Sequence, residues 1–139
     1  MKLHVLDASA WLRLFLRDGP DVPGLDAAAR EVERGAAAFA APELILVEAG
    51  HALMRKVRRK QIRATEWRAL WQDMRRMPLD LLPLDERMDD ALELAARHEL
   101  SVYDALYLAV AVRTGATLFT ADDTLAAAAR AEGIGADGR

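Results

Sequence analysis

Four acidic residues stand where their carboxylates could converge at one edge of a sheet, namely Asp7, Glu48, Asp104 and Asp122. Asp7 and Asp122 each follow a predicted strand. Glu48 and Asp104 lie in predicted helices with apolar residues four positions before and after them, which places each carboxylate on an inward-looking face. Because ligands bind at the carboxyl ends of the strands in α/β sheets, we expect the four side chains to form one site.

Converging carboxylates must be neutralised. Two of them about 4 Å apart repel by roughly 4 kcal/mol at a surface-like effective dielectric constant, and an unpaired buried charge is costly in itself. Such a cluster therefore needs bound protons or a hard cation. Mg²⁺ or Mn²⁺, which prefer oxygen ligands and keep several waters, would suit this donor set.

Each aspartate taken alone is also typical of a helix cap. The spacing of N-caps or capping boxes is found at Asp7, at Ser101 with Asp104, and at Thr120 with Asp123. Capping does not explain Glu48, which lies well inside its helix, or why the acids gather at the same end of the inferred sheet. Each aspartate alone thus favours a cap, but the four acids together favour a common site.

Apolar periodicity and breaker residues define the elements that would position these acids. Strands are predicted at residues 2–6, 36–41, 79–84 and 116–120. Helices are predicted at residues 8–16, 25–34, 42–59 with Pro42 at its first position, from a Thr65 cap to Pro78, 85–98, from Ser101 to Gly115, and 122–132. The alternation predicts one α/β domain over residues 1–139, three-layered, with a mostly parallel four- to five-stranded central sheet flanked by helices.

Composition sets limits on function. The 139 residues leave room for one domain, and 53% hydrophobic with 29% charged residues is ordinary globular usage. The absence of cysteine excludes disulfides, a thiolate nucleophile and a cysteine zinc site. The net charge of -3 gives no general indication of nucleic-acid binding. Asp7 and Arg13 interrupt the apolar N-terminal stretch, and no apolar run approaches the roughly 18 residues of a membrane span, so we expect a cytoplasmic protein without a membrane role.

Four segments share their order and spacing with a known family: VLDASA at residues 5–10, PELILVEAGHAL at 42–53, YDALYLA at 103–109 and TAD at 120–122. They closely resemble the PIN-domain nucleases, and within that family most of all the VapC toxins of bacterial toxin–antitoxin pairs. The resemblance extends over nearly the whole chain.

This resemblance implies a divalent-metal-dependent endoribonuclease that uses Mg²⁺ or Mn²⁺ and acts on RNA. It also implies a homodimer that is held inactive by a small cognate antitoxin. By motif match, the catalytic and metal-binding residues would be Asp7, Glu48, Asp104 and Asp122. Ser9 and Thr120 would be polar neighbours that orient the ligands. A metal held there would lower the pKa of a bound water and polarise the scissile phosphate.

Two departures from the family pattern concern the C-terminal part of the chain. Residues 134–139 are poorer in apolar side chains than the closing strand usual in the family, which leaves a fifth strand open. Asp123 stands where relatives more often have a basic residue.

Basic and aromatic side chains offer further candidates. One basic cluster comprises Arg55, Lys56, Arg58, Arg59, Lys60 and Arg63. It could complement the C-terminal dipole of a helix or contact RNA phosphates. We expect Trp11, Trp67 and Trp71 to serve in the core or an interface rather than in base stacking, and Trp67 with Trp71 could mark a dimer or antitoxin surface. The three histidines share no metal-binding spacing, and we assign them core or surface roles.

Three other functions fit the predicted fold less well. A haloacid dehalogenase-like phosphohydrolase needs Asp-x-Asp after the first strand, where Asp7 is followed by Ala8 and Ser9. A response-regulator receiver needs paired acids and a late lysine, but no lysine occurs after Lys60. A catalytically idle PIN-fold scaffold or interaction module ranks second, because the loss of one of the four acids would have indicated it and none is lost.

Overall fold

A parallel sheet forms the middle layer of the computed structural model, which describes residues 1–136. These residues form one sheet with the strand order β3-β2-β1-β4. The strands are β1 (Lys2–Leu6), β2 (Ala37–Pro42), β3 (Asp80–Leu82) and β4 (Thr117–Phe119). Every pairing between these strands is parallel, so their carboxyl ends lie at one edge.

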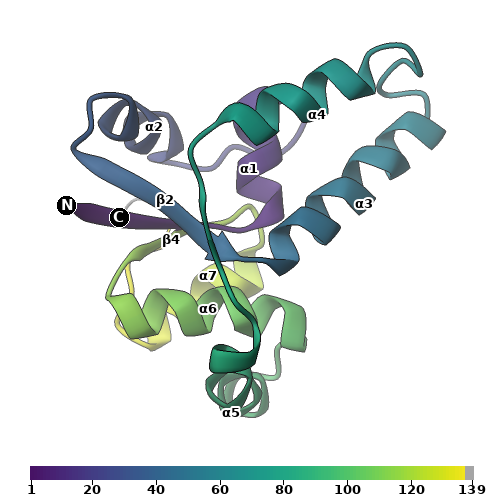
Figure 1. Cartoon of the computed structure of the whole chain (residues 1–139). Helices are drawn as coiled ribbons and strands as arrows, with labels where there is room; N and C mark the ends of the chain where they lie inside the picture. Colours follow the sequence, from purple (N-terminus) through teal and green to yellow (C-terminus); the bar gives the residue numbers. More distant parts are fainter. Residues whose placement is uncertain (137–139) are drawn as a thin grey trace.

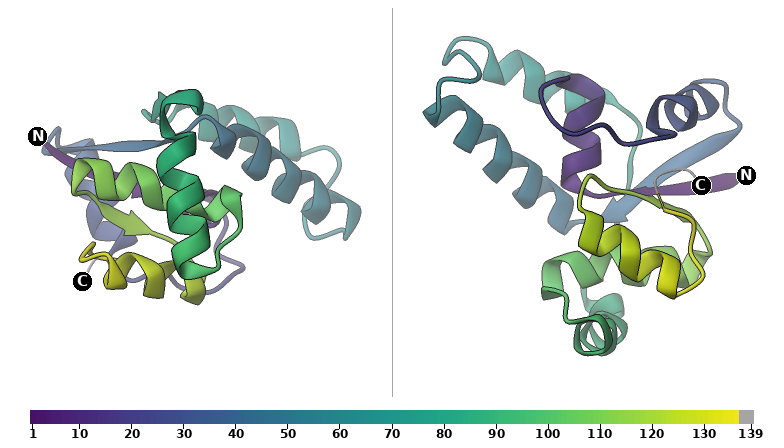
Figure 2. Two further views of the ribbon diagram at one scale, coloured as in Figure 1. Left: turned by 90° about the horizontal axis from the view of Figure 1, so that it is seen from below. Right: turned by 180° about the vertical axis from the view of Figure 1, so that it is seen from behind.

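Helices cover both faces of the sheet. They are α1 (Ala8–Phe15), α2 (Leu25–Glu33), α3 (Leu44–Arg58), α4 (Trp67–Arg76), α5 (Met88–His98), α6 (Val102–Thr114) and α7 (Asp123–Ala131), with a 3₁₀ turn at Asp85–Arg87. Figure 1 shows α1 and α2 on one face, α6 and α7 on the other, and α5 packed against α6. The helices α3 and α4 extend together beyond the sheet as an antiparallel pair, which is also clear in both views of Figure 2. Among residues 1–136, no helix is both long enough and apolar enough to cross a membrane.

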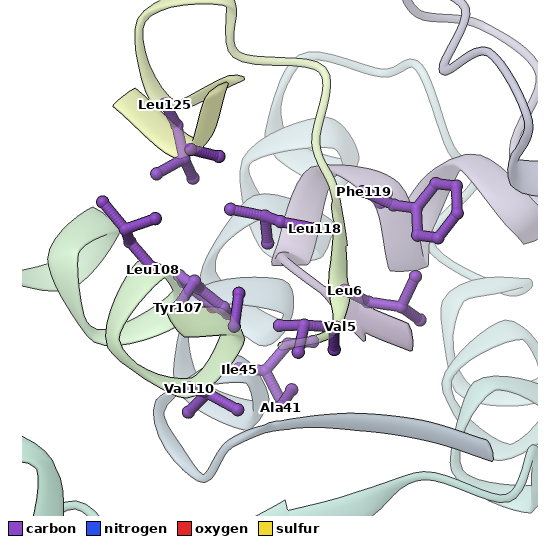
Figure 3. Packing of buried hydrophobic residues seen from close by; sticks show 14 of the residues in the cluster. Val5, Leu6, Ala41, Ile45, Tyr107, Leu108, Val110, Leu118, Phe119 and Leu125 are labelled. Carbon is purple, nitrogen blue, oxygen red and sulfur yellow. The ribbon is translucent and has the colours of Figure 1, made fainter. Parts of the chain in front are cut away.

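The core lies between the sheet and the helices on its two faces. Val5 is in register with Leu118, and Leu6 with Phe119. Because successive residues of a strand point to opposite faces, the first pair faces α6 and α7 while the second faces the other layer. Figure 3 shows this division, with Leu118 on the side of the α6 and α7 side chains and Phe119 on the other side. The helix α6 is buried continuously from residue 105 to 111, because both the sheet and other helices contact it.

The predicted α/β fold with its parallel central sheet is confirmed. Most element boundaries differ from the predicted ones by one to three residues, and two of these differences have a clear cause. Pro42 is the last residue of β2 rather than the first residue of α3. Its missing N–H is tolerated there because the pairing of β2 with β1 ends at Ala40, while the bond to β3 at this end comes from Glu43 N, which donates to Leu82 O at 2.9 Å. The predicted cap at Thr65 is wrong: α4 begins at Trp67, and no side chain caps it.

The C-terminal tail is the segment for which the sequence left a fifth strand undecided. Within the described residues the tail forms a single parallel bridge between Ala136 and Leu118, and Leu118 N donates to Gly135 O at 2.9 Å. The tail therefore starts along the free side of β4. The remainder of the predicted segment, residues 137–139, lies outside the described residues.

Candidate active site

The carboxylate of Asp7 is fixed at both oxygens. Asp7 follows β1 and is the N-cap of α1, with its Oδ1 accepting from Ala10 N at 2.9 Å and from Ser9 Oγ at 2.6 Å. Its Oδ2 accepts a hydrogen bond from Thr120 Oγ1, which follows β4. The residue is only 6% exposed. Helix capping and presentation of a charge at the sheet edge are thus combined in one side chain.

The two hydroxyl groups beside Asp7 are themselves held in place. Ser9 Oγ accepts from Ala121 N at 2.9 Å, and Thr120 Oγ1 accepts from Asp122 N at 3.0 Å. Because each oxygen already accepts a backbone N–H, its own proton is directed at Asp7, which acts as an acceptor. Burial raises the pKa of Asp7, while the hydrogen bonds from Ser9 and Thr120 oppose this rise. Among residues 1–136, no cationic side chain forms an ion pair with Asp7.

Glu48 comes from α3, in which it is half-buried. Tyr107 of α6 donates its phenolic proton to Glu48 Oε1 at 2.6 Å. The ring of Tyr107 is 1% exposed, and burial followed by this hydrogen bond raises its pKa, which keeps the phenol a neutral donor. Within the described part of the chain, Glu48 Oε2 accepts no hydrogen bond, so this oxygen is free for a ligand.

Asp104 lies in the first turn of α6. Ser101 is the N-cap of this helix, and its hydroxyl accepts from Asp104 N at 3.1 Å, as the capping interpretation predicts. Burial, followed by the negative charges of the other three candidate acids, raises the pKa of Asp104 to about 6. The four carboxylates therefore lie within each other's electrostatic field.

Asp122 is exposed and caps α7. Its Oδ1 accepts from Thr124 N at 2.8 Å and from Leu125 N at 3.1 Å. The predicted capping box of Thr120 with Asp123 is therefore wrong. The extended backbone at Asp122 makes this residue the N-cap, while Asp123 is already the first residue of α7 and the Thr120 hydroxyl is engaged with Asp7.

All four candidate acids line one cavity of about 740 Å³ at the carboxyl edge of the sheet. We call it the carboxylate cavity. The carboxylate oxygens of these four acids, none of which forms an ion pair among residues 1–136, suit a hard divalent cation chemically. Among residues 1–136, however, no three acidic or histidine side chains are gathered closely enough to hold one ion. The structure thus brings the four residues to one cavity without gathering them into a tight cage.

Several residues around the cavity were not predicted from sequence. Tyr107 was read only as part of a motif, although its position three residues after Asp104 places both on neighbouring parts of one helix face. Val47, which is 69% exposed, and Tyr103, which is 59% exposed, lie at the cavity wall. His51 of α3 lines it as well, and so does Arg55, which belongs to the basic cluster for which the sequence allowed a contact with RNA phosphates.

The tryptophans fall mainly in the core. Trp11 is fully buried, and its ring lies 5.8 Å from that of Trp71. Trp67 is partly exposed at the start of α4, with the guanidinium of Arg68 4.5 Å from its ring centre. The expectation of a core role is confirmed for Trp11.

Comparison with known proteins gives related sequences and related folds. "Ribonuclease VapC1" of Mycobacterium tuberculosis, in strains CDC 1551 / Oshkosh and ATCC 25618 / H37Rv, is 38% identical over 95 residues. The match covers 63% of this chain and 65% of that relative, so it spans less than two thirds of either.

Two solved structures share the fold. PAE2754 from Pyrobaculum aerophilum superimposes with a TM-score of 0.67 at 26% identity, covering 92% of this chain and 87% of that chain. VapBC2 from Rickettsia felis, crystallised bound to a DNA fragment from their promoter, gives a TM-score of 0.68 at 14% identity, covering 96% of each chain. The latter likeness concerns the fold alone. Finally, the sequence profile of the PIN domain matches residues 4–131, and with the parallel sheet and the carboxylate cavity this match shows that the chain belongs to the PIN domain family.

Proposed function

We propose that this protein is an Mg²⁺- or Mn²⁺-dependent endoribonuclease that hydrolyses RNA phosphodiester bonds. Its catalytic and metal-binding residues would be Asp7, Glu48, Asp104 and Asp122. The observation that carries the proposal is that all four acids line one cavity at the carboxyl edge of the sheet. In agreement with this, burial followed by the charges of the other three acids raises the pKa of Asp104 to about 6. The similarity to a protein named Ribonuclease VapC1 supports the choice of RNA as substrate.

The side chains around the cavity have distinct tasks in this mechanism. When bound, the divalent cation would supply an activated water and polarise the scissile phosphate. Ser9 and Thr120 orient Asp7 as a charged acceptor. Tyr107 holds one oxygen of Glu48 and leaves the other free for a ligand. Above pH of about 6, Asp104 is ionised and adds its charge to the site.

We further propose that the protein is the toxin of a type II toxin–antitoxin pair in the cytoplasm, with a small cognate antitoxin and a homodimeric state. The motifs that resemble the VapC toxins, together with the 38% identity to a protein named Ribonuclease VapC1, support this assignment. The exposed apolar side chains of Val47 and Tyr103 at the cavity wall offer a surface that a protein partner could cover.

The alternative is a catalytically idle PIN-fold scaffold or interaction module. One observation favours it: among residues 1–136, no three acidic or histidine side chains are gathered tightly enough for a metal ion. Retention of all four acids, with a fixed orientation for Asp7, favours the nuclease.

The decisive experiment maps cleavage of total RNA by the purified protein with Mg²⁺, with Mn²⁺ and with EDTA. Asp7→Asn removes the charge at nearly unchanged size and should abolish cleavage. Asp123→Asn is the matched control, because this neighbouring acid does not line the carboxylate cavity, and it should cleave normally. Cleavage that survives both EDTA and Asp7→Asn would contradict the proposal, and a wild type that cuts no RNA would favour the scaffold.

Co-expression with the adjacent gene tests the partner. A small protein that co-purifies and suppresses cleavage is the expected result, and a dimer is expected by light scattering. A monomer that is harmless when expressed alone and captures no neighbouring gene product would contradict the toxin assignment.

A further inference from the structure

The carboxylate cavity has two ends of opposite charge, and α3 connects them. Glu48, His51 and Arg55 all line the cavity. Spacings of three and four residues place these side chains in one row along the helix. The cavity wall therefore runs from an acid at the sheet edge to a guanidinium nearer the C-terminal end of α3.

The other cations at this end are already engaged. Lys56 Nζ pairs with Asp18 at 3.0 Å, while Arg13 donates to the carbonyl oxygens of Leu16 and Pro20, each at 3.0 Å. These two side chains hold the segment that follows α1. Arg55, in contrast, forms no ion pair or side-chain hydrogen bond with any residue in the range 1–136. It is the cation of this cavity that is available to an anionic ligand.

The distance between the two ends can be compared with a nucleic-acid strand. Seven residues of α-helix separate Arg55 from Glu48 by about 10 Å along the axis. A stacked strand advances about 3.4 Å per nucleotide, so this distance corresponds to roughly two or three nucleotides.

We propose that Arg55 binds a backbone phosphate of single-stranded RNA two or three nucleotides from the scissile bond, so that the substrate lies along α3. This inference rests on the proposed function, in which the carboxylates mark the position of cleavage. A guanidinium suits the task because its planar array of donors can hold two phosphate oxygens at once. A contact of this kind positions the strand without reading its sequence. Arg55 is thus a substrate-positioning residue for RNA of any sequence.

Binding can be measured without cleavage. Fluorescein-labelled oligouridylate is titrated with the full chain in EDTA at several salt concentrations, and polarisation gives the affinity. For single strands, each phosphate contact adds about 0.7 to the slope of log affinity against log salt, so Arg55→Gln should lower the slope by about that amount. Arg30→Gln is the matched control: Arg30 is an exposed arginine of α2 that lies outside the cavity, with no ion pair in the described range.

Arg30→Gln should keep the wild-type slope, and both variants should unfold at the wild-type temperature. Equal slopes in Arg55→Gln and wild type, or equal losses in the two variants, would overturn the proposal, because the effect of charge would then be absent or general.

The position of the phosphate is tested on a mapped cleavage site. Single methylphosphonates, which are uncharged, replace one phosphate at a time on either side of the scissile bond. A methylphosphonate two or three nucleotides from that bond should raise the KM of the wild type and leave its kcat unchanged. In Arg55→Gln the same replacement should cause no further rise in KM. Additive effects at every position would overturn the inference.

The two proposals can fail separately. If the wild type cuts no RNA but Arg55→Gln lowers the salt slope of RNA binding, the nuclease is overturned and the phosphate contact stands. If the protein cuts RNA but Arg55→Gln keeps the wild-type salt slope, the nuclease stands and the phosphate contact is overturned.

Discussion

Two hydroxyl groups and one phenol around the cavity donate to carboxylates. Ser9 and Thr120 fix Asp7, and Tyr107 fixes Glu48. A side chain that is held in this way loses little further freedom when it takes up a ligand, so the supporting donors matter almost as much as the ligands themselves. At the scale of single residues, the site depends on these donors.

The hydrogen bond of Tyr107 to Glu48 leads to a first prediction. Tyr107→Phe keeps the buried ring and removes the donor, which frees Glu48 to rotate. Loss of such a supporting group typically weakens metal binding about tenfold or more, and we expect this for Mg²⁺ by isothermal titration calorimetry.

Tyr103→Phe is the control, since this exposed hydroxyl has no hydrogen-bond partner among residues 1–136. Wild-type Mg²⁺ affinity in Tyr107→Phe would show that Glu48 is positioned by packing alone.

Asp104 leads to a prediction about pH. Its pKa is about 6 in the folded protein, against an ordinary value of 3.8 that applies to the unfolded chain. Between these values the folded state binds more protons than the unfolded state, so stability falls as pH rises. The contribution is fully present below pH of about 4 and lost above about 6.

Asp104→Asn removes this dependence, because an amide does not titrate. Urea unfolding in EDTA should therefore show the variant gaining stability relative to wild type as pH rises from about 4 to about 6. A difference that stays constant across this range would contradict the assignment.

At the scale of elements, α7 shows how one residue can serve both fold and site. Asp122 caps this helix through Oδ1 and also lines the carboxylate cavity. The sequence suggested the opposite division of labour, with Asp123 in the capping role. Local spacing could not decide between the two, because the choice depends on where the Thr120 hydroxyl is engaged, and its partner Asp7 lies far away in the sequence.

Substitutions at these two positions give a prediction. Asp122→Ala should lower the free energy of unfolding by about 1 kcal/mol, the usual value of an N-cap, and should also weaken Mg²⁺ binding. Asp122→Asn should keep the stability, since asparagine caps as well as aspartate, and still weaken Mg²⁺ binding because the charge is gone.

Asp123→Ala should have little effect on the free energy of unfolding or on Mg²⁺ binding. Urea unfolding and calorimetry on the three variants test these expectations. A larger loss of stability in Asp123→Ala than in Asp122→Ala would show that Asp123 is the cap.

The elements themselves were predictable to different degrees. The core strands and α6 follow from their apolar runs, because elements buried on several sides need little polar surface. Pro42 was misplaced because proline fits both the end of a strand and the start of a helix, and only the pairing with β3 decides. Thr65 has the chemistry of a cap, but it lies in the turn in which Glu66 N donates to Arg63 O at 3.0 Å.

At the scale of the whole molecule, average charge hides the local pattern. The net charge of -3 suggests no affinity for RNA, yet one cavity holds the four candidate acids together with Arg55, which forms no ion pair among residues 1–136. The four acids could be identified from sequence because each follows a strand or interrupts an apolar helix face. The partners of Glu48 and the availability of Arg55 could not, since both depend on contacts between distant segments.

The concentrated negative charge leads to a last prediction, for the stability of the whole chain. A ligand that binds only the folded state at a hundred times its Kd stabilises it by about 2.7 kcal/mol, which corresponds to roughly 8 °C in Tm for a chain of this size. Saturating Mg²⁺ should therefore raise the Tm of the wild type by about this amount, and that of Asp123→Asn equally. Asp7→Asn should respond only weakly, because its charge no longer contributes to binding.

Sodium chloride at matched ionic strength separates binding from screening. Salt also relieves repulsion among the carboxylates, but only by shielding, which is nearly complete only between exposed charges farther apart than a Debye length, about 10 Å at 0.1 M. The effect of Mg²⁺ should therefore exceed that of sodium chloride in the wild type and match it in Asp7→Asn. Equal shifts with the two salts in the wild type would mean that the cavity attracts cations without binding one, and the proposed metal site would have to be abandoned.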